Sequence, residues 1–366
     1  IVVSEIAKNK TGKKKIVVAS ILAALTMTAN IVTVEGAIPE GTRTDHLGLA
    51  IGTSSNSKSN QSVAIGYASS AEAPGANPEN PATAVGAGAN ANGAGTVALG
   101  LSANATGTNA VALGGGSNGG TNKTEATAAN ATAIGFNAKA SKSGAAAIGS
   151  GAKASGSDSI SFGTDTVADS EKAIAIGAGS KATNIGATAL GRSSAATAAS
   201  ATAVGSLASA TGTTATAVGI EASASGAESL AIGKTASATS GRALAVGTNA
   251  KATGASSVAV GSGAGNSGPL GFASSINSLG SVVNSLKTIN YATTAEGDYA
   301  VALGVYANAK NSGVAVGQNA LAATGGVAIG KGVLEDTGNN LAGGVAIGQD
   351  SASTGAYSLA MGRHAF

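Results

Sequence analysis

The sequence predicts an all-β fold, a parallel β-roll (solenoid) made of 14-residue coils. Three observations support this prediction. A phrase of four residues, an apolar residue or Thr followed by Ala, an apolar residue and Gly, returns every 14 residues from Ala131 to Gly261. The chain has 56 Gly and only nine aromatic residues, which is too few large side chains for an ordinary globular core. Charged residues are too sparse for the usual signature of disorder.

Each unit contains two short segments in which apolar and other residues alternate, as in a strand. In one representative unit the first segment places Thr202 and Val204 on one face, expected to be the interior, and Ala203 on the other. The second segment places Ala208 and Ala210 inside. Stacked at ~4.8 Å, twenty copies of the phrase would form two parallel sheets and a rod of roughly 95 Å. A helix is excluded because the apolar positions lie two apart.

The first 37 residues follow a different pattern. Five Lys between positions 8 and 15 precede an apolar run from Ile16 to Met27, which is the order found in a secretion signal. We expect residues 1–37 to be such a signal; the alternative is a surface helix with a basic end. Removing them leaves 16 basic and 16 acidic residues. The mature chain therefore has no overall positive charge that would attract nucleic acid or anionic lipid.

The phrase is absent between Gly261 and Gly304. Apolar residues in this segment are spaced by three and four positions, as in a helix: Phe272, Ile276, Leu279, Val283, Leu286 and Ile289. We expect a helical or hairpin insertion over 262–300, between head coils at 38–261 and further coils at 301–366. The alternative is an apolar segment folded as two irregular coils.

The residue two before each Gly forms a column that is Ala in nineteen of twenty copies, with Ser161 as the exception. In the orientation given above, this column faces outward, where a closely packed neighbouring chain requires small residues and water does not. A thin interior of Val, Ile and Ala buries little apolar area for one chain. We therefore expect an obligate homo-oligomer with these interface residues: Ala133, Ala147, Ala175, Ala189, Ala203, Ala217, Ala231, Ala245 and Ala259.

One copy of the phrase lies in the string Gln61-Ser-Val-Ala-Ile-Gly-Tyr-Ala-Ser69. This string and the 14-residue spacing resemble the head of YadA-like trimeric autotransporter adhesins, over roughly Leu47 to Gly362. Residues 1–10 resemble the end of the extended signal peptide that these proteins carry. The resemblance implies a left-handed β-roll, a homotrimer and display at the outer membrane. We expect the chain to be the N-terminal part of such a protein, with no direct membrane insertion by this segment.

The resemblance also implies a function. An adhesin head of this family would bind extracellular matrix proteins such as collagen, fibronectin or laminin, or other bacterial cells, and would contribute to virulence. The alternative is a passive spacer or coat, with binding carried by another part of the full protein. The sequence lacks the residues for a His-dependent catalytic triad or a multi-His metal site, because His46 and His364 are the only histidines and lie at opposite ends of the repeats. The sequence indicates no cofactor and no metal.

Candidate ligand contacts fall in two groups. Gln61, Ser62, Ala64 and Tyr67 surround the best copy of the phrase, and Lys139, Lys153, Lys181 and Lys251 occupy the outward column of the second segment. We expect the lysines to form a solvated face that keeps the rod soluble; the alternative is a weak basic strip for an acidic matrix polymer. Thr188, Thr202 and Thr216 are expected to form a hydrogen-bonded stack inside the roll and not an ice-binding surface.

Overall fold

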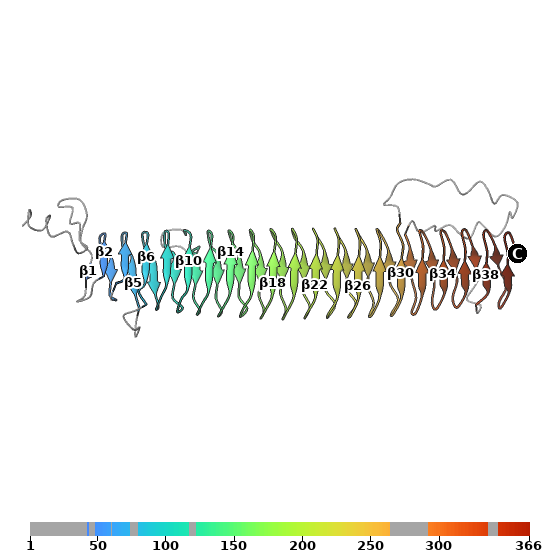
Figure 1. Cartoon of the computed structure of the whole chain (residues 1–366), viewed down its shortest axis with the longest axis horizontal. Helices are drawn as coiled ribbons and strands as arrows, with labels where there is room; N and C mark the ends of the chain where they lie inside the picture. Colours follow the sequence, from blue (N-terminus) through green and yellow to red (C-terminus); the bar gives the residue numbers. More distant parts are fainter. Residues whose placement is uncertain are drawn as a thin grey trace, which may run out of the picture.

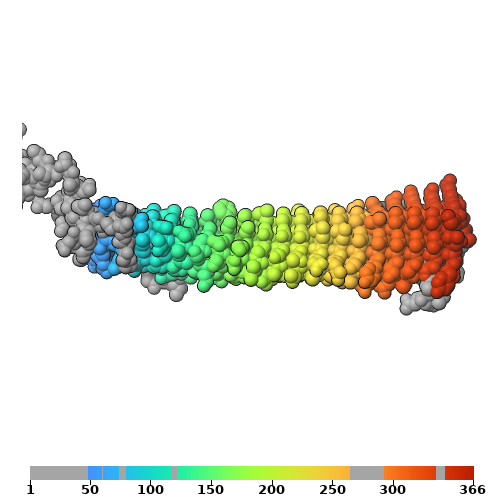
Figure 2. All heavy atoms as spheres, turned by 60° about the horizontal axis from the view of Figure 1, so that its bottom comes forward, coloured from blue at the N-terminus to red at the C-terminus, as the bar shows by residue number. Residues whose placement is uncertain are grey.

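The computed structural model describes residues 42–43, 48–59, 61–73, 80–116, 122–263, 292–335 and 343–366. These residues form one long rod of stacked coils (Figure 1). They contain 40 short strands, β1 to β40, and no helix. In the space-filling view the coils form regular ridges across the rod (Figure 2).

The even-numbered strands form one parallel sheet, here called sheet A, which carries the repeated phrase. Its strands are β2 Leu49–Ile51, β4 Val63–Ile65, β6 Thr83–Val85, β8 Val97–Leu99, β10 Val111–Leu113, β12 Thr132–Ile134, β14 Ala146–Ile148, β16 Ile160–Phe162, β18 Ile174–Ile176, β20 Thr188–Leu190, β22 Thr202–Val204, β24 Thr216–Val218, β26 Leu230–Ile232, β28 Leu244–Val246, β30 Val258–Val260, β32 Val301–Leu303, β34 Val314–Val316, β36 Val327–Ile329, β38 Val345–Ile347 and β40 Leu359–Met361.

The odd-numbered strands form the second parallel sheet, sheet B. Its strands are β1 Thr42–Arg43, β3 Asn56–Ser57, β5 Ser70–Glu72, β7 Asn90–Asn92, β9 Asn104–Ala105, β11 Glu125–Ala126, β13 Lys139–Ala140, β15 Lys153–Ala154, β17 Val167–Ala168, β19 Lys181–Ala182, β21 Ala195–Ala196, β23 Ser209–Ala210, β25 Ser223–Ala224, β27 Ser237–Ala238, β29 Lys251–Ala252, β31 Thr294–Ala295, β33 Asn308–Ala309, β35 Leu321–Ala322, β37 Leu334–Glu335 and β39 Ala352–Ser353.

Every strand pairs with its own copy in the next coil, which confirms the predicted parallel β-roll. In the regular block the partners are 14 residues apart, as for Thr202 and Thr216. Two successive coils are one residue shorter, because Val301 pairs with Val314 and Val314 pairs with Val327. The shortenings fall in the turns before β34 and β36, where the backbone N–H of Gly313 donates to the carbonyl of Lys310 at 2.7 Å and that of Gly326 donates to the carbonyl of Ala323 at 3.0 Å. The repeat therefore tolerates a missing turn residue without a change of strand register.

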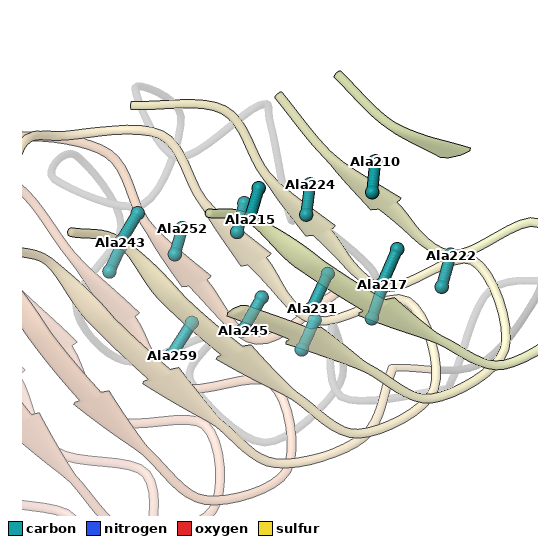
Figure 3. Close-up of a cluster of buried hydrophobic side chains, with 14 of the residues drawn as sticks. Ala210, Ala215, Ala217, Ala222, Ala224, Ala231, Ala243, Ala245, Ala252 and Ala259 are labelled. Atoms are coloured by element: carbon teal, nitrogen blue, oxygen red, sulfur yellow. The ribbon is translucent and has the colours of Figure 1, made fainter. Parts of the chain in front are cut away.

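The interior of the roll consists of small side chains from both sheets. In the coil of β22 and β23, Ala201, Ala203, Ala208 and Ala210 are all fully buried. Figure 3 shows this arrangement in the neighbouring coils, with alanines of sheet A and sheet B pointing into the space between the sheets. The sequence-based orientation of the second segment is thus correct, and that of the first segment is reversed.

The expectation that the sheet A alanines face outward as interface residues is wrong. All nine are buried inside the roll with no exposed surface: Ala133, Ala147, Ala175, Ala189, Ala203, Ala217, Ala231, Ala245 and Ala259. The reason is steric: the two sheets of a 14-residue coil lie so close that four methyl-sized side chains fill the space between them. The larger flanking residues, such as Thr202 and Val204, point outward and are half-buried.

Eight buried hydroxyls at the interior position after a turn are satisfied locally, whereas the Oγ atoms of Ser180 and Ser229, at the same position in other coils, have no hydrogen-bond partner. The eight hydroxyls donate to the carbonyl of the glycine three residues earlier at 2.7–3.1 Å, which closes the turn and removes the cost of a buried polar group. The residues that do so are Ser55, Ser69, Thr96, Ser159, Thr166, Ser194, Ser257 and Ser351. Where this bond forms, Ser and Thr replace Ala in the interior at little cost.

The glycine that ends each phrase is required for two reasons. Gly205 has a φ of 130°, a backbone conformation that side chains with a Cβ rarely adopt. A Cβ on Gly205 would also lie 2.4 Å from the carbonyl oxygen of Gly219 in the next coil. The glycine column thus permits both the corner and the close stacking of coils.

Two expected segments lie largely outside the described residues. The predicted secretion signal, 1–37, and residues 264–291 of the predicted insertion are not described. The end of that predicted insertion belongs to the rod, because β31 pairs with β29 and β33 in regular register. The coils therefore resume by Thr294, before the boundary expected at position 301.

Candidate interaction surfaces

The outward side of sheet A carries two columns of apolar side chains, one on each side of the buried alanine column. The first column is Val, Ile, Leu or Thr apart from Ala146, and the second is Val, Ile or Leu apart from Phe162 and Met361. No Asp, Glu, Lys or Arg occurs in either column of the described strands. Along the rod these columns form a face, here called the sheet A face, with half-buried or exposed members throughout.

Several members of the sheet A face are exposed beyond the usual level for large apolar residues. They are Leu99 (38%), Ile160 (39%), Phe162 (52%), Leu190 (42%), Ile232 (38%), Ile329 (38%), Leu359 (65%) and Met361 (62%). Three strand residues at ~3.3 Å rise, repeated over a rod of roughly 95 Å, give a strip of about 950 Å². Monomeric soluble proteins rarely expose a contiguous apolar patch of more than about 300–600 Å². The sheet A face therefore has the character of a contact surface.

The expected threonine stack inside the roll is wrong as well. Thr188, Thr202 and Thr216 pair in register on β20, β22 and β24, but they are half-exposed members of the first column of the sheet A face. They face outward for the same reason as their Val and Ile counterparts, since the interior admits only the alanine between them.

The outward side of sheet B is mostly polar. The position after each sheet B alanine is Ser or Thr in most coils of the regular block: Thr127, Ser141, Ser155, Thr183, Thr197, Thr211, Ser225, Thr239 and Thr253. The preceding outward column carries the candidate lysines, together with Ser209, Ser223 and Ser237. We refer to these two columns as the sheet B face.

The four candidate lysines point outward as predicted, but they do not form an uninterrupted basic strip. Lys139 and Lys153 are register neighbours, whereas Lys181 has Val167 and Ala195 as its neighbours. Carboxylates offset two of the charges. The Nζ of Lys139 lies 3.5 Å from Oε2 of Glu125, and that of Lys153 lies 3.0 Å from Oδ1 of Asp169.

The residues around the best copy of the phrase are divided between surface and interior. Gln61 and Tyr67 are exposed, Tyr67 by 66%, and lie in the turns before and after β4. Ser62 and Ala64 are fully buried, and the Oγ of Ser62 accepts a hydrogen bond from the backbone N–H of Ala82 at 3.0 Å. The expectation that Ser62 and Ala64 contact a ligand is therefore wrong, because both side chains belong to the interior of their coil.

The apolar columns of sheet A lie on the surface, although their size and alternation with Ala predict an interior position. The positions of the small residues indicate the correct orientation. Ala201 and Ala203 lie two apart before the turn, and Ala208 and Ala210 lie two apart after it, so each pair shares one face of its segment. Four small columns of one closed coil must share one interior if that interior is narrow.

The described parts of the chain contain no cluster of three or more His, Cys, Asp or Glu residues able to hold a metal ion. Within those same ranges no helix is long and apolar enough to cross a membrane. The rod thus offers its two faces and its turns as the surfaces on which a function can be built.

A comparison with known families agrees with this architecture. The YadA head domain repeat matches residues 47–76, 81–103, 91–117, 126–152, 154–180, 182–208, 210–236, 238–264, 291–307, 295–320 and 342–365. A search of curated proteins found no matching relative. The matches follow the coils of the rod and cover most of the chain, in a family of adhesins and not of enzymes. The chain therefore belongs to the YadA head repeat family, as the head of a YadA-like trimeric autotransporter adhesin.

Proposed function

We propose that three copies of this chain pack their sheet A faces together around the long axis of the rod and act as a cell-surface adhesin head. The observation that supports this proposal is the uncharged apolar sheet A face. Its area of about 950 Å² per copy exceeds the ~800 Å² per partner of a standard stable protein interface. Aliphatic and aromatic side chains in that position lose their contact with water when copies associate.

This arrangement replaces the alanine interface expected from the sequence. The buried alanines make each coil thin, and Val, Ile and Leu on the sheet A face supply the contacts between copies. Each copy then gains apolar burial that its own interior, built from alanine, does not provide. The sheet B face and the turns remain exposed on the outside of the trimer.

The exposed surface of such a trimer suits multivalent binding. Three parallel rods present every coil three times, so weak contacts at many coils combine into avidity. We propose that the ligand is an extracellular matrix protein such as collagen, fibronectin or laminin, or the surface of another bacterial cell, and that the head is displayed outside the outer membrane. Gln61, Tyr67 and the lysines of the sheet B face are the candidate contacts.

Binding of the purified full chain to immobilised collagen, fibronectin and laminin tests this function. We expect saturable binding by the trimer and a large loss for a monomeric variant with unchanged turns and sheet B face, because only the trimer binds with avidity. A trimer that shows no saturable binding to matrix proteins or to bacterial cells at micromolar concentration would instead support the passive spacer.

A further inference from the structure

The outward side of sheet B changes character toward the C-terminal end of the rod. In the described strands its first outward column is polar or charged apart from Val167, Ala195, Leu321, Leu334 and Ala352. Leu321 and Leu334 are register partners on β35 and β37, and Leu334 pairs in turn with Ala352. These three half-buried residues form an apolar patch, here called the leucine patch. Such a patch on a face otherwise suited to water is stabilised when another apolar surface covers it.

A segment of this chain with suitable chemistry leaves and rejoins the rod nearby. Residues 264–291 lie outside the described residues, between Gly263 after β30 and Ala292 before β31. Their sequence contains one charged residue, Lys287, and an apolar residue at every third or fourth position from Phe272 to Ile289. In a helix this spacing places the apolar side chains on one side. The sequence therefore predicts a segment with an apolar side that favours a partner.

The described residues at the end of this segment indicate on which side of the rod it rejoins. Thr294 belongs to the first outward column of sheet B, where its counterparts with described side chains are half-buried or exposed. Only 3% of Thr294 is exposed, and only 7% of Ala292. The hydroxyl of Thr294 donates to the carbonyl of Ala292 at 3.2 Å. The chain that enters β31 therefore lies over the outward side of sheet B.

The length of the segment limits the part of sheet B that it can cover. A helix over residues 272–289 would be about 27 Å long, and residues 264–271 can span up to about 26 Å when extended. A path out and back therefore reaches about five coils at ~4.8 Å per coil. Toward the C-terminus, the register places Leu321 two coils and Leu334 three coils beyond β31.

The opposite direction offers no comparable surface. The five nearest coils toward the N-terminus carry only polar residues or alanine in the same column: Lys251, Ser237, Ser223, Ser209 and Ala195. Val167 lies seven coils from β31, beyond the reach of the segment. Within reach on this column, only the leucine patch presents large apolar side chains.

We propose that residues 264–291 dock on the leucine patch and pack their apolar side against Leu321 and Leu334. The docked segment turns the Ser and Asn residues between its apolar positions toward water. The rod is then wider on the sheet B side over these coils than in the regular block. Docking uses the face opposite to the sheet A face, so the inference does not depend on the proposed trimer.

The sequence of the segment makes the docking measurable. Lys287 is its single Lys or Arg, and proteolysis of a docked segment follows the fraction of molecules in which it is released. Limited trypsin digestion of the full chain is followed by mass spectrometry, with a synthetic peptide of residues 264–291 as the reference for unprotected cleavage. We expect Lys287 in the full chain to be cleaved at least tenfold more slowly than in the peptide.

Substitutions in the leucine patch should release the segment. We expect Leu321→Ser and Leu334→Ser each to raise the rate of cleavage at Lys287 about tenfold, as a loss of about 1.4 kcal/mol of docking free energy implies. Val167→Ser is the matched control and should leave the rate unchanged, because it removes a large apolar side chain from the same column outside the reach of the segment. Leu279→Ser alters the segment and no residue of the rod; it should raise the rate as well, and it decides the matter if the patch variants do not fold.

Several results would overturn the proposal. Cleavage at Lys287 as fast in the full chain as in the peptide means that the segment is not docked. An unchanged rate in both patch variants, or an equal rise in Val167→Ser, means that the leucine patch does not hold it. A rise in Val316→Ser, on the sheet A strand of the coil that contains Leu321, without a rise in Leu321→Ser would place the segment on the sheet A face. Sedimentation velocity on the same samples reports the trimer separately.

Discussion

The two outward faces of the rod differ although the same coil builds both. Every coil contributes one strand to each sheet, and in most coils both strands place alanine in the interior, as Ala203 and Ala210 do in one coil. On the sheet A face the outward neighbours are aliphatic, such as Val204, whereas on the sheet B face they are polar, such as Ser209. The interior residues therefore hold the coil together, and the outward residues determine whether each face of the rod contacts another protein surface or water.

This difference explains how such a thin solenoid becomes stable. Alanine side chains bury little apolar area, and burial is the main favourable contribution that offsets the entropy of ordering a chain. A rod with polar residues on both faces would lack that contribution. A rod with apolar residues on both faces would associate with further rods on each side and aggregate. One apolar and one polar face permit a closed assembly with a soluble exterior.

The largest effect is expected from a charge on the sheet A face. Val204→Asp and Ser209→Asp place the same side chain on opposite faces of one coil. We expect Val204→Asp to abolish the trimer, because three copies of the carboxylate would be buried near one another without a counter-charge. Ser209→Asp should remain trimeric, with stability changed by less than ~0.5 kcal/mol.

Sedimentation velocity and thermal unfolding of the two variants measure this contrast. If Val204→Asp remains a trimer with an unchanged melting temperature, the sheet A face is not the contact surface. If Ser209→Asp dissociates instead, the roles of the two faces are exchanged.

A large effect is also expected at the corner that joins the two faces. Gly205→Ala introduces a Cβ at a φ of 130° and 2.4 Å from the carbonyl oxygen of Gly219, so both the turn and the coil spacing must change. We expect a loss of more than ~3 kcal/mol in the free energy of unfolding, measured by chemical denaturation. Gly179→Ala is the control, since its φ is 68° and the nearest atom to an added Cβ is the Oγ of Ser193 at 3.5 Å; it should cost only about 1–2 kcal/mol.

A smaller effect distinguishes the interior from the sheet A face within a single strand. Ala203→Val inserts two methyl groups into a fully occupied interior and should destabilise the chain by about 1–3 kcal/mol. Thr202→Val, at the adjacent outward position, conforms to the rest of its column and should be neutral or stabilising. Equal effects in urea unfolding would contradict the assignment of opposite faces to these two residues.

The sequence predicted the period, the two sheets, the turns and the family, because these depend on spacing alone. It also gave the correct orientation of sheet B, since Lys153 and Lys181 cannot be buried in a narrow roll. The first strand contains no charged residue, and its alternation of Ala with Val is compatible with either face inside. Larger residues lie in the interior of a globular core, but the interior of this coil is too narrow to hold them, so they lie outside.

The candidate contacts follow the same division. Tyr67 and the lysines are exposed as expected, since their size and charge exclude them from this interior. Ser62 and Ala64 are small enough to fit and are buried. In a roll of this width, residue size decides burial more strongly than polarity does.

The smallest effect is expected from the lysines of the sheet B face. Lys153→Ala removes an ion pair with Asp169 whose side chains are 52% and 36% exposed, and such pairs contribute about 0–1 kcal/mol. The same change removes the repulsion between Lys153 and its register neighbour Lys139, which offsets part of the loss. We expect the melting temperature to change by less than about 3 °C and the trimer to persist.

Lys181→Ala is the matched control, because its register neighbours are Val167 and Ala195 and it removes a lysine flanked by uncharged residues. Since neither substitution alters the fold, their effect on ligand binding isolates the charge of the sheet B face. The basic strip is supported if both variants bind an acidic matrix polymer more weakly than the unsubstituted chain does. Added salt should then also weaken binding by the unsubstituted chain. Unchanged binding by both variants means that the lysines serve only to keep this face in water, and the exposed turns then become the place where the ligand binds.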